Sequence, residues 1–158
     1  MTLTNVTART VRRHVLDIVT VLAHDGVDML REAANAPAAG DDWFRLCPHT
    51  GRLLAPTPEL LVTVVEPVVL DGPLEAHITF DYQTLGHAPL RRKGRATLRL
   101  VAMATGSNPW TEVTVLVSAR PRVPGLAAPR WAREATERFL TSLARRIEHA
   151  LGVLPAAP

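Results

Sequence analysis

The chain has 158 residues, of which 47% are hydrophobic and 21% are charged. This length and balance predict a single domain, residues 1–158, with enough apolar surface to bury a core, and they exclude a chain that is disordered throughout. The formal net charge is only +3 despite a pI near 10, so the protein's electric field would steer charged partners weakly.

Membrane spans and disulfides are not expected. A membrane-spanning helix needs about 20 apolar residues, and the most apolar stretch, Leu60–Leu70, is interrupted by Thr63, Glu66 and Pro67. The N-terminus shows no basic region followed by an apolar block, so no secretory signal is visible. The lone Cys47 cannot form an internal disulfide. Together these features predict a cytoplasmic protein.

The N-terminal region carries apolar residues at helical spacing, namely Val11, Val15, Ile18, Leu22, Met29 and Ala33. This spacing predicts a helix over Ala8–Asn35, capped by Thr7, or two helices with a break near His24–Gly26. The competing interpretation is a short first strand at Thr2–Arg9, which its threonines favour but its poor alternation does not. Residues 1–6 and 153–158 are expected to fray.

The middle of the chain begins with short elements. Ala36–Asp42 is small, polar and turn-rich and is expected to be a loop, whereas Arg52–Ala55 is expected to be a short strand. Glu59–Val69 is rich in β-branched residues, which favours a longer strand. Because Pro67 cannot donate a ladder hydrogen bond, it predicts an edge position, a bulge or a break in that strand.

Three later segments alternate between apolar and polar residues. In Leu74–Thr84, one face carries Leu74, Ala76, Ile78, Phe80 and Tyr82, and the other carries Glu75, His77, Thr79, Asp81 and Gln83. Gly94–Thr105 and Trp110–Arg120 alternate similarly around a turn at Gly106–Pro109, which predicts a hairpin. Each segment therefore reads as a strand with one buried face.

The chain ends in an amphipathic segment that predicts a helix over Pro129–Leu151. One stripe of it is apolar, namely Ala132, Ala135, Phe139, Leu143, Ile147 and Ala150. Pro129 suits the first turn, and Gly152 suits the C-terminal cap. A late hairpin that leads into a long helix predicts an α+β fold, in which a curved antiparallel sheet wraps around the C-terminal helix and a helical segment comes first.

The last third of the chain resembles a known superfamily. Gly94-Arg-Ala-Thr-Leu-Arg-Leu, then Trp110-Thr-Glu-Val-Thr-Val-Leu-Val, then the helix around Ala132–Leu151 resemble the end of START-like (SRPBCC) proteins, which include polyketide cyclase/dehydrase-like, lipid-transfer and birch-pollen-allergen-like members. The resemblance implies a helix-grip fold over a hydrophobic pocket. It spans Leu60–Leu151 as an order of elements.

The start of the chain departs from that superfamily, which usually opens with a clear strand before two short helices. A nuclear-transport-factor-like cone is therefore the alternative fold, since it also places helices first and a curved sheet later. The resemblance implies no catalytic residues, because these vary between members of the superfamily.

A ligand-binding wall can be proposed from the inward apolar faces. Its candidate residues are Phe80, Tyr82, Leu98, Leu100, Val113, Val115, Val117, Phe139 and Leu143. Tyr82 is the preferred polar contact because its hydroxyl could orient a ligand, and Glu66 and Arg45 are weaker candidates. The same residues could instead form a closed core, and the sequence does not separate these two interpretations.

No catalytic or metal-binding pattern stands out. The six histidines lack a ligand-like spacing, and His77 and Asp81 would lie about 13 Å apart on a strand, too far for one metal. Cys47 precedes Pro48 and His49, but neighbouring side chains on an extended segment point apart, which favours an incidental thiol. We therefore expect no metal and no cofactor, and assign no catalytic residue.

The only compact basic cluster is Arg91, Arg92, Lys93 and Arg95, which is expected to be a solvated loop. Nucleic acid is not expected as a partner because no aromatic platform accompanies the cluster. Arg95 and Arg99 are expected to pair across strands with Glu75 and Asp81.

The predicted function is binding of a hydrophobic small molecule, lipid or polyketide-like. The alternatives are a polyketide cyclase/dehydratase-type enzyme of the same fold and an interaction module that uses residues 91–95. A homodimer that covers an edge strand such as Glu59–Val69 also stays open.

Overall fold

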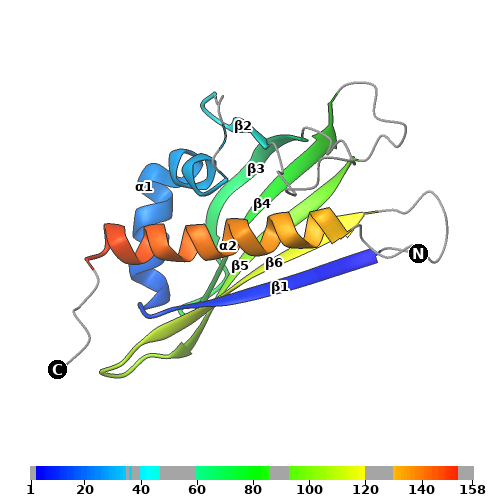
Figure 1. Cartoon of the computed structure of the whole chain (residues 1–158). Coiled ribbons are helices and arrows are strands. Elements are labelled where there is room, and N and C mark those ends of the chain that lie inside the picture. The colour runs from blue at the N-terminus through cyan, green and yellow to red at the C-terminus, as the bar shows by residue number, and fades with distance from the viewer. Residues whose placement is uncertain are drawn as a thin grey trace.

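The computed structural model describes residues 3–34, 36, 40–46, 60–85, 93–119 and 130–152. Within these residues, six strands and two helices follow one another along the chain (Figure 1). They are β1 (Leu3–Val11), α1 (Val15–Ala33), β2 (Trp43–Leu46), β3 (Leu60–Leu70), β4 (Glu75–Thr84), β5 (Lys93–Ala104), β6 (Trp110–Ala119) and α2 (Arg130–Ala150). The predicted strand Arg52–Ala55, Cys47, Arg91, Arg92 and residues 153–158 lie outside the described part.

The strands form one antiparallel sheet in the order β1-β6-β5-β4-β3-β2. Figure 1 shows both helices on the concave face of this sheet, with α2 running alongside β1. The helix α1 packs against α2 and against the strands at the β2–β3 side. The predicted α+β arrangement, a curved sheet around a long C-terminal helix, is confirmed.

Paired strands place the alternating apolar residues in rows across the concave face. One row joins Ile78, Leu98 and Val115, and the next joins Ala76, Leu100 and Val113. All six side chains are buried, together with Leu140, Leu143 and Ile147 of α2. The predicted inward faces of these three strands therefore supply the core of the protein, with the exception of Leu74, which precedes β4 and is exposed.

The predicted start of the first helix is wrong. Residues 3–11 form β1, which pairs with β6 from Leu3 opposite Ala119 to Val11 opposite Thr111, so residues 3–6 belong to a strand and are not a frayed tail. The alternative first strand, Thr2–Arg9, was the better interpretation. Thr7 caps nothing, and α1 begins at Val15 with His14 as its N-cap, whose Nδ1 accepts a hydrogen bond from the Leu16 amide at 3.1 Å.

The predicted break within this helix is present. Asp25 has non-helical backbone angles (φ −120°, ψ 24°), next to Gly26. The helix ends at Ala33, close to the predicted end at Asn35. Its side chains Val15, Ile18, Leu22, Met29 and Ala33 are buried as the spacing predicted.

Pro67 sits in an irregular part of β3. The register against β4 shifts between Val64 and Glu66 and again between Glu66 and Val69, so Pro67 lies in a bulge, one of the three predicted outcomes. β3 is not an edge strand over its whole length, because β2 pairs with Leu60–Thr63. Beyond Thr63, no described strand covers this side of β3.

The last helix matches its prediction closely. It spans Arg130–Ala150, and Gly152 follows with a left-handed φ of +67°, as expected for the residue that ends a helix. The predicted apolar stripe needs two corrections, because Leu140 is fully buried and Ala150 is exposed. Neither described helix is both long and apolar enough to cross a membrane.

Candidate functional site

The nine residues predicted to form an apolar wall all belong to one hydrophobic cluster or pack against it. Six are buried, namely Phe80, Leu98, Leu100, Val113, Val115 and Leu143. Tyr82, Val117 and Phe139 are partly buried and pack against the others. The structure thus brings together the residues that the sequence analysis grouped, and it separates them into a closed part and a more open part.

The open part coincides with the smallest side chains of the central strand β5. Gly94 lies between Tyr82 and Ala119, and Ala96 lies between Phe80 and Val117. In the next two rows the same strand contributes Leu98 and Leu100, both 0% exposed. The two outer rows therefore have smaller β5 side chains at the centre of the concave face than the two inner rows do.

The two weaker candidates lie away from this wall. Glu66 faces Thr79 on the opposite face of the sheet, where its Oε2 lies 3.8 Å from Nε2 of His77. Arg45 is exposed on β2, one residue after the buried Phe44, so it points to the face away from the core. Neither residue lines the concave face.

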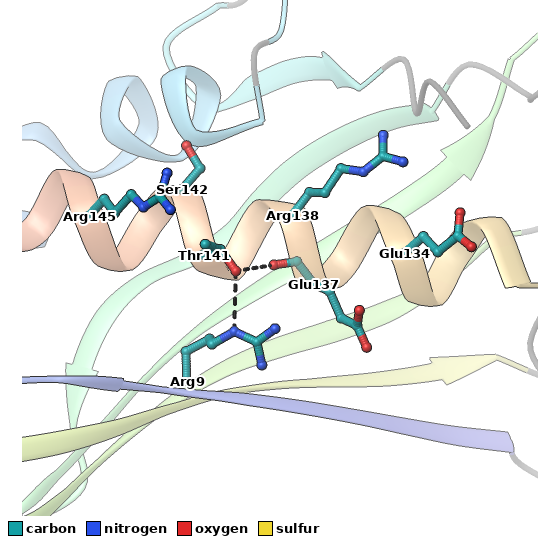
Figure 2. A pocket seen from close by; sticks show the side chains of 7 residues that line it. All are labelled: Arg9, Glu134, Glu137, Arg138, Thr141, Ser142 and Arg145. Carbon is teal, nitrogen blue, oxygen red and sulfur yellow. Dashed lines mark hydrogen bonds between the residues drawn. The ribbon is translucent and has the colours of Figure 1, made fainter. Parts of the chain in front are cut away.

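A polar groove of about 440 Å³ lies on the other side of α2, and Figure 2 shows its lining. Arg9 comes from β1, and α2 supplies Glu134, Glu137, Arg138, Thr141, Ser142 and Arg145. The sequence analysis missed this groove. The available signal was the polar stripe at positions 134, 138, 141 and 145 of the last helix, but nothing local in the sequence places Arg9 beside it.

Two hydrogen bonds hold the guanidinium of Arg9 in the groove. Its Nε donates to Oγ1 of Thr141 at 3.2 Å, and its Nη1 donates to the Ala8 carbonyl at 2.9 Å (Figure 2 draws the first). Thr141 in turn donates to the carbonyl of Glu137 at 2.9 Å. The strand and the helix are thereby joined through one arginine.

The outer face of the sheet carries ion pairs that the strand pattern predicted. Arg95 donates to Asp81 at 2.9 Å and Arg99 donates to Glu75 at 2.5 Å. Arg95, one member of the predicted basic cluster, is therefore paired. In each case, the carboxylate beside the guanidinium raises the pKa of the arginine.

His77 forms a second cluster on this outer face. Its Nδ1 lies 2.5 Å from Oδ2 of Asp71, and this hydrogen bond, together with the charges of Asp71 and Glu66, raises the pKa of His77 above its usual 6.5. The two carboxylates approach opposite ring nitrogens, so they cannot share one metal ion with the ring. In the part of the chain that the structure describes, no group of histidine, cysteine and acidic residues is arranged to hold a metal.

Comparison with known proteins is informative only at the level of structure. No family model matches the sequence, and no protein of curated function matches it. A conserved protein from Geobacillus kaustophilus is 11% identical with a TM-score of 0.56, and the alignment covers 95% of this chain and 97% of that one. A hypothetical protein, jhp0584, from Helicobacter pylori is 11% identical with a TM-score of 0.54, covering 92% and 87%.

Ara h 8.0201 is 10% identical with a TM-score of 0.51, and the alignment covers 94% of this chain and 99% of that one. The chain has a helix-grip fold. The initial strand and the long final helix thus agree with the fold that the resemblance implied, and the cone-like alternative is wrong. At such low identity these likenesses show the fold alone.

Proposed function

We propose that the protein binds a hydrophobic small molecule between the concave face of the sheet and the N-terminal half of α2. The graded burial of the wall is the observation that carries the proposal. Leu98, Leu100 and Leu143 are fully buried, whereas Tyr82, Val117 and Phe139 remain partly exposed beside the small residues Gly94 and Ala96. Partly exposed large side chains that surround small residues form a surface that an apolar ligand would cover.

Removal of apolar ligand surface from water would supply the affinity, at about 25 cal/mol per Å². Tyr82 supports the orientation of such a ligand, because it is the one member of the wall with a hydroxyl group. It is also the only member of the wall that can exchange a proton, so we propose binding without a reaction. The likeness of the fold to Ara h 8.0201 is compatible with this proposal.

The direct test is native mass spectrometry of the protein purified without denaturant. A stoichiometric adduct that is released on acidification supports the proposal and gives the ligand's mass. An apo mass alone, with no uptake from a mixed panel of lipids and aromatic polyketides, contradicts it.

A pair of variants on β5 then locates the site. Ala96→Phe adds a large side chain on the concave face between Phe80 and the partly buried Val117, so we expect loss of the adduct in protein that circular dichroism shows to be folded. Thr97→Phe adds a ring one residue later on the outer face, where Thr97 pairs with Thr79 and Leu116, and should keep the adduct. Retention of the ligand by a folded Ala96→Phe protein would contradict this location.

A further inference from the structure

Two of the three arginines in the groove between β1 and α2, Arg9 and Arg145, have no carboxylate partner among the described residues. In the described residues, no carboxylate lies within 4.0 Å of Arg9 or Arg145, whereas Arg95, Arg99 and Arg146 each have one at 2.5–3.0 Å. Arg145 and Arg146 are neighbours on α2, and only Arg146 is paired, with Glu32 at 3.0 Å. Arg9 and Arg145 therefore differ from Arg95 and Arg99 on the outer face of the sheet, each of which has a carboxylate partner.

Arg9 occupies a strand position that is otherwise apolar. It pairs with Val113, so it lies on the concave face in the same row as Leu100 and Ala76. Those three residues are buried, whereas Arg9 is exposed. Its guanidinium instead emerges between strand and helix, fixed through Nε and Nη1. A guanidinium has five N–H donors, so the remaining ones, including both on Nη2, are available to an incoming acceptor.

The rest of the lining limits the charge of that acceptor. Figure 2 shows Glu134 toward the N-terminal end of α2, Glu137 extending toward β1 on the same side as Arg9, and the hydroxyl of Ser142 on the opposite side of the helix from that of Thr141. Three arginines and two glutamates leave the lining with a net charge of +1. A single anionic group fits this net charge, and a polyanion would be repelled by the two carboxylates.

We propose that this groove binds one phosphate or carboxylate group of a small soluble molecule, held by the guanidinium groups of Arg9 and Arg145. Its volume of about 440 Å³ lies within the range of small-molecule sites. The site is on the solvent-facing side of α2 and is separate from the apolar wall on the other side. Binding here does not depend on whether the apolar site is occupied.

The test uses O-phosphoethanolamine as the soluble probe and nuclear magnetic resonance of the arginine Nε–H groups as the readout. The Nε–H of Arg9, which is hydrogen-bonded to Thr141, should shift and saturate, while the Nε–H of Arg99 on the opposite face of the sheet should not move. A shift that never saturates, or an equal shift of both arginines, overturns the proposal.

Matched variants on α2 separate the site from general charge attraction. Arg145→Gln should lower the affinity for O-phosphoethanolamine about tenfold, as expected for loss of one charge-assisted hydrogen bond. Arg9→Gln should lower it by the same factor. Arg146→Gln, which removes the same charge from the neighbouring residue, should stay within about twofold. Equal losses in Arg145→Gln and Arg146→Gln overturn the proposal.

A second arm distinguishes a soluble ligand from a membrane headgroup. Vesicles of phosphatidylglycerol are mixed with the protein and sedimented under the same salt conditions. Binding to the vesicles without saturable binding of O-phosphoethanolamine overturns the assignment to a soluble molecule. Circular dichroism of each variant confirms that it is folded before its affinity is compared.

Discussion

At the scale of single residues, His77 links two parts of the sheet that are apart in the chain. It lies opposite Val69 across the β3–β4 ladder, and its ring meets Asp71 after the β3 bulge and Glu66 before the second register shift. Arg99 of β5 is its other strand neighbour, and Glu75 lies two residues away on the same face. Two acidic neighbours thus act on the ring directly, and Arg99 is neutralised by Glu75.

Stability should therefore depend on pH through this residue. Hydrogen bonding to Asp71 raises the pKa of His77 in the folded protein, so its charged form stabilises the fold below the unfolded pKa of about 6.5. That contribution is lost as pH rises through the folded pKa. The free energy of unfolding of wild type and His77→Gln should differ most near pH 6, by up to about 1 kcal/mol for this partly exposed cluster.

Chemical denaturation from pH 6 to pH 9 checks this prediction. His149→Gln is the control, because His149 is exposed on α2 and has no acidic partner among the described residues. Its difference from wild type should be small at every pH. A His77→Gln difference that is the same at pH 6 and pH 9 would show that the raised pKa has no effect on stability.

At the scale of elements, two glycines differ in whether the backbone requires glycine. Gly152 ends α2 with φ +67°, and Gly26 lies inside α1 with an ordinary φ; an added Cβ would touch nothing at either position. Gly152→Ala should lower the free energy of unfolding by about 1 kcal/mol, since an alanine is strained in the left-handed region. Gly26→Ala should raise it by about 0.5–1 kcal/mol.

Thermal or chemical unfolding of both variants gives the sign directly. Because neither substitution meets a neighbouring atom, any change reports backbone preference and not packing. A stabilising Gly152→Ala would contradict the left-handed cap that the structure assigns.

The elements that the sequence predicted well are those with strong local patterns. β4, β5 and β6 alternate cleanly, and α2 has a continuous stripe, so their bounds agree within one residue. β1 was mistaken for helix because its partner, β6, is about a hundred residues away, and an edge strand tolerates Thr7 and Arg9 without a clear apolar face. Pro67 predicted an irregularity in β3, but only the pairing of β3 with β4 shows that the irregularity is a bulge.

The candidate site shows the same difference between features set by local sequence patterns and features set by long-range pairing. Membership of the apolar wall followed from alternation within single strands, so all nine residues lie in or against one cluster. The division of that wall into closed and open parts depends on which residues pair across strands, such as Gly94 with Tyr82. The groove was missed for the same reason, since only the docking of α2 beside β1 brings Arg9 to Thr141.

At the scale of the whole molecule, the core and the proposed ligand compartment are two ends of one apolar layer. Leu100 is fully buried between Ala76 and Val113, whereas Phe139 of α2 is only partly buried. Stability and ligand binding should therefore separate along the layer. Leu100→Ala should lower the free energy of unfolding by about 2–5 kcal/mol and leave the ligand adduct in place, because it creates a cavity in the closed part.

Phe139→Ala should lower stability less than Leu100→Ala does, but it should abolish ligand binding. Its ring is only partly buried, so we expect a loss of about 1–2 kcal/mol, together with loss of the adduct, because the ring is part of the proposed roof of the compartment. Denaturant titration and native mass spectrometry of the two variants measure both quantities on the same samples. If Phe139→Ala costs as much stability as Leu100→Ala and no adduct is found even in wild type, the layer is a closed core along its whole length, and the groove beside α2 becomes the first place to look for a ligand.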